Sequence, residues 1–345
     1  MKKFIFLVVI SILAIIAVGC GDNNNNASSE DDGVQDTKIK FSHVVAENTP
    51  KHQGAEAMKE YVEDESDGKI EMEIYPDSSL FGDDDEIENL VSNNVQFIAP
   101  DLSKLVGHNP QFNVPSLPFA FDNDEAAEAF WDGDKGQEVL ESLKDDGVLG
   151  LYMWPNGGKQ ITYNGDPVKS PEDFKGMKFR TQGGQVLESL YEELGAGSES
   201  IAFDELYNAL DQGVVDGEEN TWSNIESKKF DEVQDYTTEL NHTRVDYAVF
   251  TNTEFWDGLN DETKEIVEDG LEKGTEVARE NAAQLAEEGK DTIKERGDSE
   301  VIELSDDEIE SFRDALEPIY DKFEDDIGKD VYEAVEDAND EYGDK

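Results

Sequence analysis

Arg180 is the residue that most suggests a binding site. It ends a short apolar strand at residues 177–180, and the Thr-Gln-Gly-Gly that follows is compatible with a polar loop at a sheet edge. Ligands of α/β sheets bind beyond the carboxyl ends of the strands. A guanidinium placed there can hold a carboxylate through two parallel hydrogen bonds, which a lysine cannot do. On its own, however, the pattern fits a surface salt bridge in an acid-rich chain better.

Motifs for catalysis and metal binding are missing from the sequence. It contains no nucleophile elbow, no phosphate-binding loop and no His-Glu-x-x-His segment. The histidines lack the spacing of metal ligands, and structural or exposed roles are expected for His52, His108 and His242. His43, beside a strand end, is the better candidate for a site. We therefore expect no cofactor, no metal and no enzymatic activity.

Glu218 and Glu219 leave one enzymatic alternative open, an extracellular hydrolase that uses them as an acid and base pair on an anionic substrate. Adjacent residues of a strand normally point to opposite faces of the sheet. Chance pairs of acids are also common in this composition, so the hydrolase is the disfavoured interpretation.

The chain is strongly acidic. Asp and Glu number 84 against 28 Lys and Arg, which gives a net charge of -56. Nucleic acid is therefore excluded as a partner. Disorder is not expected, because apolar residues recur with helical and strand periods. The composition predicts adaptation to high salt, which screens surface repulsion, so a bound anion must be held by local positive groups.

The first residues predict export and lipid attachment. Residues 4–17 form an apolar run that is too short to cross a bilayer but typical of a signal peptide. Small residues precede Cys20, the only cysteine, and resemble the lipobox of bacterial lipoproteins; a buried free cysteine is the alternative. We assign residues 1–19 to a lipoprotein signal peptide and 20–37 to a disordered polar tether. The protein is expected to be extracytoplasmic, with Cys20 as its lipid anchor in the cell membrane.

The rest of the chain alternates between strand and helix patterns, which predicts an α/β fold with mostly parallel sheets. Strands are expected at residues 38–43, 70–74, 95–99, 148–153, 177–180 and 214–215, and helices at 50–67, 83–92, 123–145 and 203–212. Residues 260–296 predict one helix of about 54 Å that crosses between two lobes, although Gly270 and Gly274 could kink or split it. A last amphipathic stretch spans residues 312–335.

Several segments, all in order, resemble the solute-binding proteins of TRAP transporters. They are FSHVVAENTPK (41–51), YPDSSLFG (75–82), LPFAF (117–121), WPNGGKQ (154–160), DFKGMKFR (173–180), AFDELYNAL (202–210) and GVVDGEENTWSN (213–224). The resemblance implies a two-lobed fold with a ligand cleft between the lobes, hinge strands and a long lobe-spanning helix. Lobe I would then comprise residues 38–157 and about 247–284, and lobe II residues 158–246 and about 285–345.

The same resemblance implies roles for single residues. Arg180 matches the family's arginine that pairs with the ligand carboxylate, and Asn220 matches an asparagine that adds a hydrogen bond. Many members carry a second arginine where this chain has Lys159. Gln182 follows the pattern of the branch that binds four-carbon dicarboxylates, whereas Gly183 and Gly184 stand where serines are expected, which suggests a roomier inner wall.

Membership of that branch would make malate, succinate or fumarate the ligand. Lys159 or Lys51 would meet the second carboxylate, and we also place Ser103, His43 and Trp222 near the ligand. The expected protein partners are the small and large membrane subunits of a TRAP transporter. Keto acids and sugar acids remain alternative ligands, and a sensory receptor that presents its ligand to a membrane kinase remains an alternative function.

Overall fold

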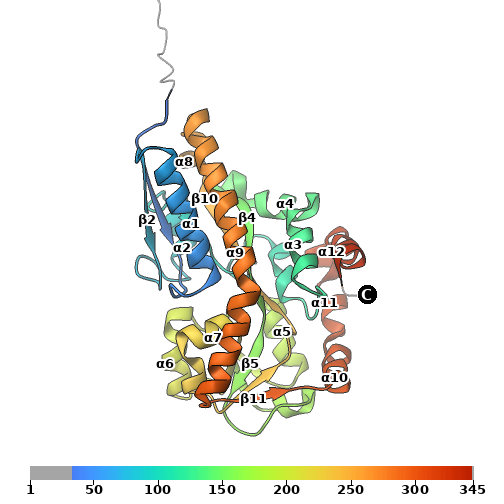
Figure 1. Ribbon diagram of the computed structural model, residues 1–345. Coiled ribbons are helices and arrows are strands. Elements are labelled where there is room, and N and C mark those ends of the chain that lie inside the picture. Colours follow the sequence, from blue (N-terminus) through green and yellow to red (C-terminus); the bar gives the residue numbers. More distant parts are fainter. Residues whose placement is uncertain (1–32, 344–345) are drawn as a thin grey trace, which may run out of the picture. The chain divides into compact units, whose positions relative to one another are not determined.

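The computed structural model describes residues 33–343, so the predicted signal peptide and Cys20 lie outside the described residues. Within this range, no helix has both the length and the apolar character that a membrane crossing needs. The chain forms two β-sheets, and the helix α9 (Asp261–Arg296) runs past both of them (Figure 1).

The first sheet combines parallel and antiparallel strands. Its order is β2 (Ile70–Tyr75), β1 (Thr37–Ser42), β3 (Phe97–Ile98), β10 (Arg244–Asn252) and β4 (Val148–Gly158). β1 is parallel to β2 and β3, whereas β10 is antiparallel to β3 and β4. In β2, Ile70 and Met72 are buried while Glu71 and Glu73 are exposed, as the alternation in the sequence predicts.

The second sheet is also mixed. Its order is β11 (Glu300–Glu303), β9 (Tyr236–Glu239), β5 (Gln160–Tyr163), β8 (Gly217–Asn220), β6 (Lys178–Thr181) and β7 (Gly197–Ser200). β6 is parallel to β7 and β8, and β9 to β11, whereas β5 is antiparallel to β8 and β9. The prediction of mostly parallel sheets is therefore wrong for β4, β5 and β10, the strands at which the chain passes between the two sheets, because they pair antiparallel with their neighbours.

The elements around the first sheet are called lobe I here, and those around the second sheet lobe II. The chain passes from lobe I to lobe II at Lys159 and returns through residues 240–243. The remaining α-helices are α1 (Pro50–Glu65), α2 (Glu86–Val91), α3 (Asp124–Asp132), α4 (Asp134–Leu140), α5 (Gln185–Glu193), α6 (Leu206–Asp211), α7 (Trp222–Lys228), α8 (Thr253–Asp257), α10 (Asp306–Leu316), α11 (Pro318–Ile327) and α12 (Lys329–Tyr342). The 3₁₀ helices are η1 (Leu102–Leu105), η2 (Pro110–Ser116), η3 (Glu141–Asp146), η4 (Pro171–Phe174), η5 (Phe203–Glu205) and η6 (Phe230–Glu232).

The long helix α9 is continuous, and its glycines serve packing rather than a kink. It packs against α1 of lobe I and α7 of lobe II. A Cβ atom on Gly274 would lie 2.7 Å from the carbonyl oxygen of Gly54 in α1, and one on Gly270 would lie 2.5 Å from Val62. The small residues therefore let the two helices approach closely.

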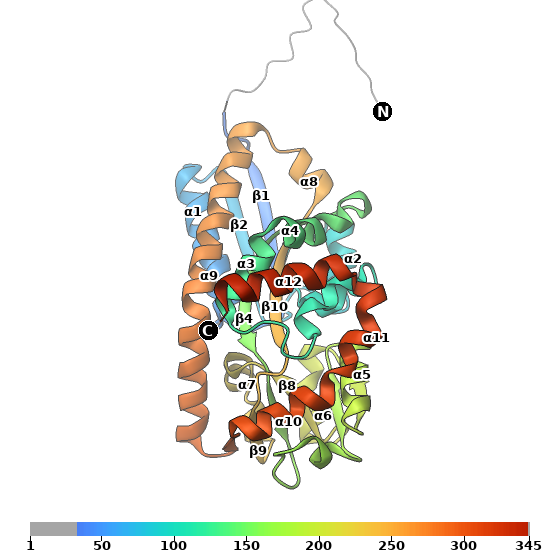
Figure 2. The same cartoon turned by 90° about the vertical axis from the view of Figure 1, so that its right-hand side faces the viewer.

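The C-terminal helices connect the lobes. Phe312 and Leu316 of α10 are buried in the core of lobe II. In contrast, α11 and α12 bury Ile319, Phe323 and Val331 with the apolar residues of lobe I, and α12 packs on α3 (Figure 2). The assignment of residues 285–345 to lobe II is corrected for these two helices, because an amphipathic pattern does not say which lobe it covers.

Other boundaries also differ from the sequence prediction. The expected helix at 123–145 divides into α3, α4 and η3, with Gly133 between the first two. Val214 and Val215 lie in a turn after α6, and the strand begins at Gly217. The predicted tether ends earlier than residue 37, because the backbone N–H of Gln35 donates to Thr263 Oγ1 at 2.8 Å and Thr37 begins β1.

Candidate functional site

A small cavity lies where the two lobes meet. Lobe I contributes Val44, Asp83, Asp101, Lys104, Val245 and Tyr247 to its lining, and lobe II contributes Arg180, Gln182, Phe203, Asn220 and Asn224. Its volume is about 20 Å³, room for about one water molecule. Pockets for small ligands typically measure about 300–1,000 Å³, so a bound organic anion needs the surrounding side chains or lobes to move apart.

The position of Arg180 follows from the short strand β6. Phe179 before it is buried in the core of lobe II, where its ring stacks on Tyr191 with 4.9 Å between centroids. Because side chains alternate along a strand, Arg180 points away from that core and toward the cavity.

The guanidinium of Arg180 has unused hydrogen-bond donors. The residue is 0 % exposed, and its Nε donates to the carbonyl oxygen of Ile201 at 2.8 Å. Among the described residues, neither Nη1 nor Nη2 has a hydrogen-bond partner. Leaving buried charged donors unpaired is costly. This arrangement is therefore the one expected of an anion-binding group.

Glu218 is the nearest competitor for Arg180. The two residues are paired in register on the parallel strands β6 and β8, so their side chains lie on the same face of the sheet. Glu218 accepts hydrogen bonds from Thr162 Oγ1 at 3.2 Å and from Asn220 Nδ2 at 3.1 Å. Burial raises the pKa of Glu218 to about 7 although Arg180 opposes this rise. Near neutral pH this carboxyl can be uncharged, which leaves Arg180 available to a ligand.

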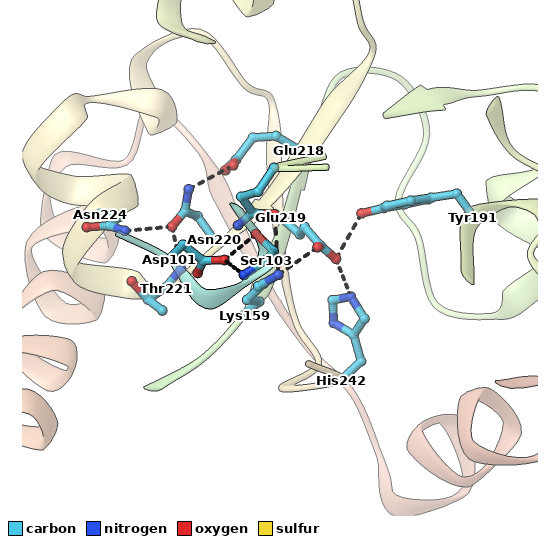
Figure 3. Close-up of polar contacts among 11 residues, drawn as sticks. Asp101, Ser103, Lys159, Tyr191, Glu218, Glu219, Asn220, Thr221, Asn224 and His242 are labelled. Atoms are coloured by element: carbon cyan, nitrogen blue, oxygen red, sulfur yellow. Dashed lines mark hydrogen bonds and ion pairs between the residues drawn. The ribbon is translucent and has the colours of Figure 1, made fainter. Parts of the chain in front are cut away.

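Asn220 is held in place at the end of β8. Its Oδ1 accepts from the backbone N–H of Thr221 at 3.1 Å and from Asn224 Nδ2 at 2.8 Å, as Figure 3 shows. Asn224 also donates to the hydroxyl of Tyr247 at 2.9 Å, which links the wall of lobe II to β10 of lobe I. A fixed amide beside Arg180 can orient a carboxylate.

Lys159 is engaged elsewhere. Its Nζ donates to Glu219 Oε1 at 2.9 Å and to Gln182 Oε1 at 3.4 Å. The other oxygen of Glu219 lies 2.7 Å from His242 Nε2 and accepts from Tyr191 at 3.1 Å (Figure 3). Burial works against ionisation of Glu219, but Lys159 and His242 outweigh it and hold its pKa down to about 2. Lys159 therefore neutralises Glu219 and does not line the cavity.

The predicted lobe I residues surround the cavity at different depths. Lys51 donates to the carbonyl oxygen of Ala99 at 2.7 Å and lies 3.4 Å from the ring centre of Tyr247, and burial lowers its pKa to about 8. Ser103 donates its backbone N–H to Asp101 Oδ1 at 2.9 Å, and Asp101 faces the cavity. Neither Lys51 nor Ser103 lines the cavity itself.

Two other predicted site residues lie away from the cavity lining. His43 is buried, and its Nε2 lies 3.1 Å from His52 Nδ1. Burial lowers the pKa of His43 well below its usual value. Trp222 begins α7 and belongs to an apolar core, and its backbone carbonyl lies close to Gly289 of α9. Of the predicted ligand-binding residues, Arg180, Gln182 and Asn220 meet at the cavity.

Sequence reasoning missed an acidic and basic pair in the lining. Asp83 Oδ2 accepts from the backbone N–H of Phe203 at 2.9 Å, a contact between the lobes. The Nζ atom of Lys104 lies 3.5 Å from the same oxygen. Lys104 stands next to the predicted Ser103, but Asp83 carries no local signal in a segment of three consecutive aspartates.

The comparisons with known proteins agree with this geometry. Residues 41–326 match the family described as bacterial extracellular solute-binding protein, family 7. The chain belongs to this family. The resemblance to the TRAP solute-binding proteins is thus confirmed, and the protein is a two-lobed extracytoplasmic solute-binding receptor.

Similar family 7 proteins include two curated relatives. The C4-dicarboxylate-binding periplasmic protein DctP of Vibrio cholerae is 38% identical over 342 residues, with 98% of this chain and 99% of the relative covered. The C4-dicarboxylate-binding protein DctB of Bacillus subtilis is 41% identical over 275 residues, with 78% of this chain and 79% of the relative covered.

Solved family 7 structures share the fold. A TRAP periplasmic solute-binding protein from Shewanella oneidensis with bound succinate has a TM-score of 0.86 and 40% identity, covering 88% of this chain and 99% of that one. One from Pseudomonas aeruginosa with bound L-malate has a TM-score of 0.81 and 39% identity, covering 83% and 99%.

The hydrolase alternative finds no support in this family or in the geometry. Within β8, Glu218 is paired with Thr162 and Arg180, whereas Glu219 is paired with Ile161 and binds Lys159 from the opposite face. The two carboxyls therefore do not face one substrate. Among residues 33–343, no group of three or more His, Cys, Asp and Glu side chains is placed to hold a metal ion.

Proposed function

We propose that this protein captures a C4-dicarboxylate, such as malate, succinate or fumarate, and presents it to the membrane subunits of a TRAP transporter. The observation that carries the proposal is the buried Arg180 guanidinium at a closed cavity, whose two terminal nitrogens have no hydrogen-bond partner among residues 33–343. Support also comes from the relatives named as C4-dicarboxylate-binding proteins and from the succinate and malate complexes.

Binding uses the two lobes in sequence. The ligand enters between separated lobes, and one carboxylate receives two parallel hydrogen bonds from Nη1 and Nη2 of Arg180. Asn220 and Gln182 orient this carboxylate from the same lobe. Lobe I then closes over the ligand, and the hydrogen bond from Phe203 to Asp83 forms part of the closed arrangement.

A sugar acid is the second candidate ligand. A protein with 30% identity and a TM-score of 0.86 has been solved in complex with galactonate. The expectation that Gly183 and Gly184 leave a roomier inner wall is wrong, because neither lines the cavity and a Cβ atom there would lie 3.3 Å from Ser200 or 3.2 Å from Val106. The higher identity of the dicarboxylate binders favours the four-carbon ligand.

The proposal has further parts. The ligand is released chemically unchanged, so recovery of a reaction product from a long incubation would contradict a pure receptor.

Cys20 carries the lipid that keeps the protein at the membrane, and mass spectrometry of the protein isolated from membranes tests this. The acidic surface adapts the protein to high salt, and Arg180 supplies the local attraction that the net charge of -56 opposes.

A thermal-shift screen of organic acids at low and high salt tests the ligand class. A ligand present at 100 times its Kd stabilises the folded protein by about 2.7 kcal/mol, which moves the unfolding midpoint measurably. We expect C4-dicarboxylates to give the largest shifts. Shifts by sugar acids, sugars or amino acids, with none from dicarboxylates, would overturn the ligand assignment.

A further inference from the structure

We propose that Lys104, rather than Lys159 or Lys51, binds the second carboxylate of the ligand and makes the site selective for dicarboxylates. This inference rests on the proposed function, because it concerns the same cavity. It assigns the far end of the ligand to lobe I, opposite Arg180 on lobe II.

The three lysines near the cavity differ in what their ammonium groups contact. Lys159 pairs with Glu219 at 2.9 Å, and Lys51 donates to Ala99 and lies against the ring of Tyr247. Both are directed into the protein. Lys104 and Arg180 are the cationic side chains that line the cavity within the described chain.

The ammonium group of Lys104 is held in position by two aspartates but does not use all of its hydrogen-bond donors. Its side chain is 9% exposed, and Nζ lies 3.3 Å from Asp84 Oδ1 and 3.5 Å from Asp83 Oδ2. Asp84 is 76% exposed, so its attraction is weakened by solvent. An ammonium group has three donors. The long distances to both aspartates leave donor capacity for a carboxylate that enters the cavity.

Asp83 contacts both Lys104 and lobe II, so the position of this lysine depends on the closure of the lobes. Its Oδ2 accepts from the backbone N–H of Phe203 in lobe II, and the ring centre of Phe203 lies 6.0 Å from the guanidinium carbon of Arg180. The carboxylate that positions Lys104 therefore also contacts the segment that packs beside Arg180. Closing the lobes brings the two cations to opposite sides of one ligand.

Selectivity follows from the charge at each end. A dicarboxylate gives both Arg180 and Lys104 an ionised partner in a water-poor space, where such pairs are strong. A ligand whose second end is uncharged forms no ion pair with Lys104, which then keeps only its two aspartate partners. Lys104 therefore adds nothing to the binding free energy of such a ligand. Lys104 should therefore affect the affinity for dicarboxylates much more than that for monocarboxylates of the same length.

Calorimetry on the full chain with succinate and its monoamide, succinamate, tests this. We expect Lys104→Met to weaken succinate binding by about 30-fold or more and succinamate binding by less than about threefold. Lys135→Met is the matched control, since Lys135 also pairs with two carboxylates, Glu138 and Asp330, but lies outside the cavity lining. It should change neither affinity.

Two outcomes would overturn the role of Lys104. One is succinate binding by Lys104→Met within about threefold of wild type. The other is an equal loss for both ligands, which indicates a structural effect. If Lys104→Met does not fold, Lys104→Gln is used instead, and Lys104→Arg should retain the preference for succinate. Failure of the wild type to bind any dicarboxylate contradicts the proposed function instead, so the two failures are distinct.

Discussion

Arg180 and Lys159 are both buried cations beside the same cavity, and they differ in their partners. Lys159 has a carboxylate at 2.9 Å, which His242 and Tyr191 also contact. Arg180 donates through Nε alone, and its two terminal nitrogens are unpaired within the part of the chain that the structure describes. In a chain with 84 acids and 28 bases, a fully buried arginine without a carboxylate partner within residues 33–343 needs an explanation.

Other buried or half-buried arginines of this chain are paired with carboxylates, as Lys159 is. Arg244 pairs with Asp124 and Asp246, Arg279 with Asp132, and Arg296 with Asp231 and Glu226. Burial of a cation therefore does not mark a site in this protein. Unpaired terminal nitrogens at a cavity do, because Arg244, Arg279 and Arg296 each have a carboxylate partner and Arg180 has none among residues 33–343.

Removing Lys159 should have the largest effect on the stability of the fold. Lys159→Met leaves the buried Glu219 with His242 and Tyr191 only, and breaking a buried pair typically costs about 3–5 kcal/mol. Denaturant unfolding measures this change. Lys38→Met is the matched control because Lys38 and Glu71 form an exposed pair, 84% and 62% exposed, and it should leave the unfolding midpoint unchanged. If Lys159→Met were as stable as Lys38→Met, the buried pair of Lys159 and Glu219 would contribute no more to stability than an exposed pair, which would contradict this account.

Glu218 should set the pH dependence of binding. Its pKa is raised to about 7, so below pH 7 the neutral carboxyl leaves Arg180 free, and above pH 7 the carboxylate competes with the ligand. Affinity for succinate should therefore fall as pH rises above 7, by at most about tenfold per unit for one proton.

Glu218→Gln should flatten the profile around pH 7 in calorimetric titrations from pH 6 to 9. Burial raises the pKa of Glu86 to about 8 and lowers the pKa of Lys51 to about 8. Titration of these two groups should leave a smaller pH dependence of the succinate affinity near pH 8. A wild-type affinity that rises with pH would contradict this role of Glu218.

Much of the fold could be predicted from local patterns. Thr49 and Pro50 mark the start of α1, the alternation of Ile70 to Ile74 predicts β2, and the uninterrupted pattern after Asn260 predicts α9. Val214 and Val215 are β-branched but fall in the turn after α6, because Gly213 has the left-handed φ of 66° that ends the helix there. A two-residue apolar run is too short to indicate a strand.

The partners of the buried charges could not be predicted in the same way. Glu219 and Lys159 are 60 positions apart, and Asp83 and Phe203 are 120 apart. No local pattern carries such pairings, so the sequence pointed to Lys159 and Lys51, whose ammonium groups are engaged elsewhere, and missed Lys104 in the cavity lining. The position of Arg180 at a strand end singled it out, but on its own that pattern fitted a surface salt bridge better, and only the family resemblance implied its role.

Titration of succinate into wild-type and Arg180→Met protein at neutral pH tests the role of the unpaired guanidinium. Loss of a charged partner from a buried carboxylate should cost about 2–5 kcal/mol of binding free energy, a loss of about 30-fold or more in affinity. The unliganded variant should be more stable than Lys159→Met, since Arg180 has no carboxylate partner to abandon. Succinate binding as tight as in the wild type would contradict the assignment of Arg180 as the anion-binding group.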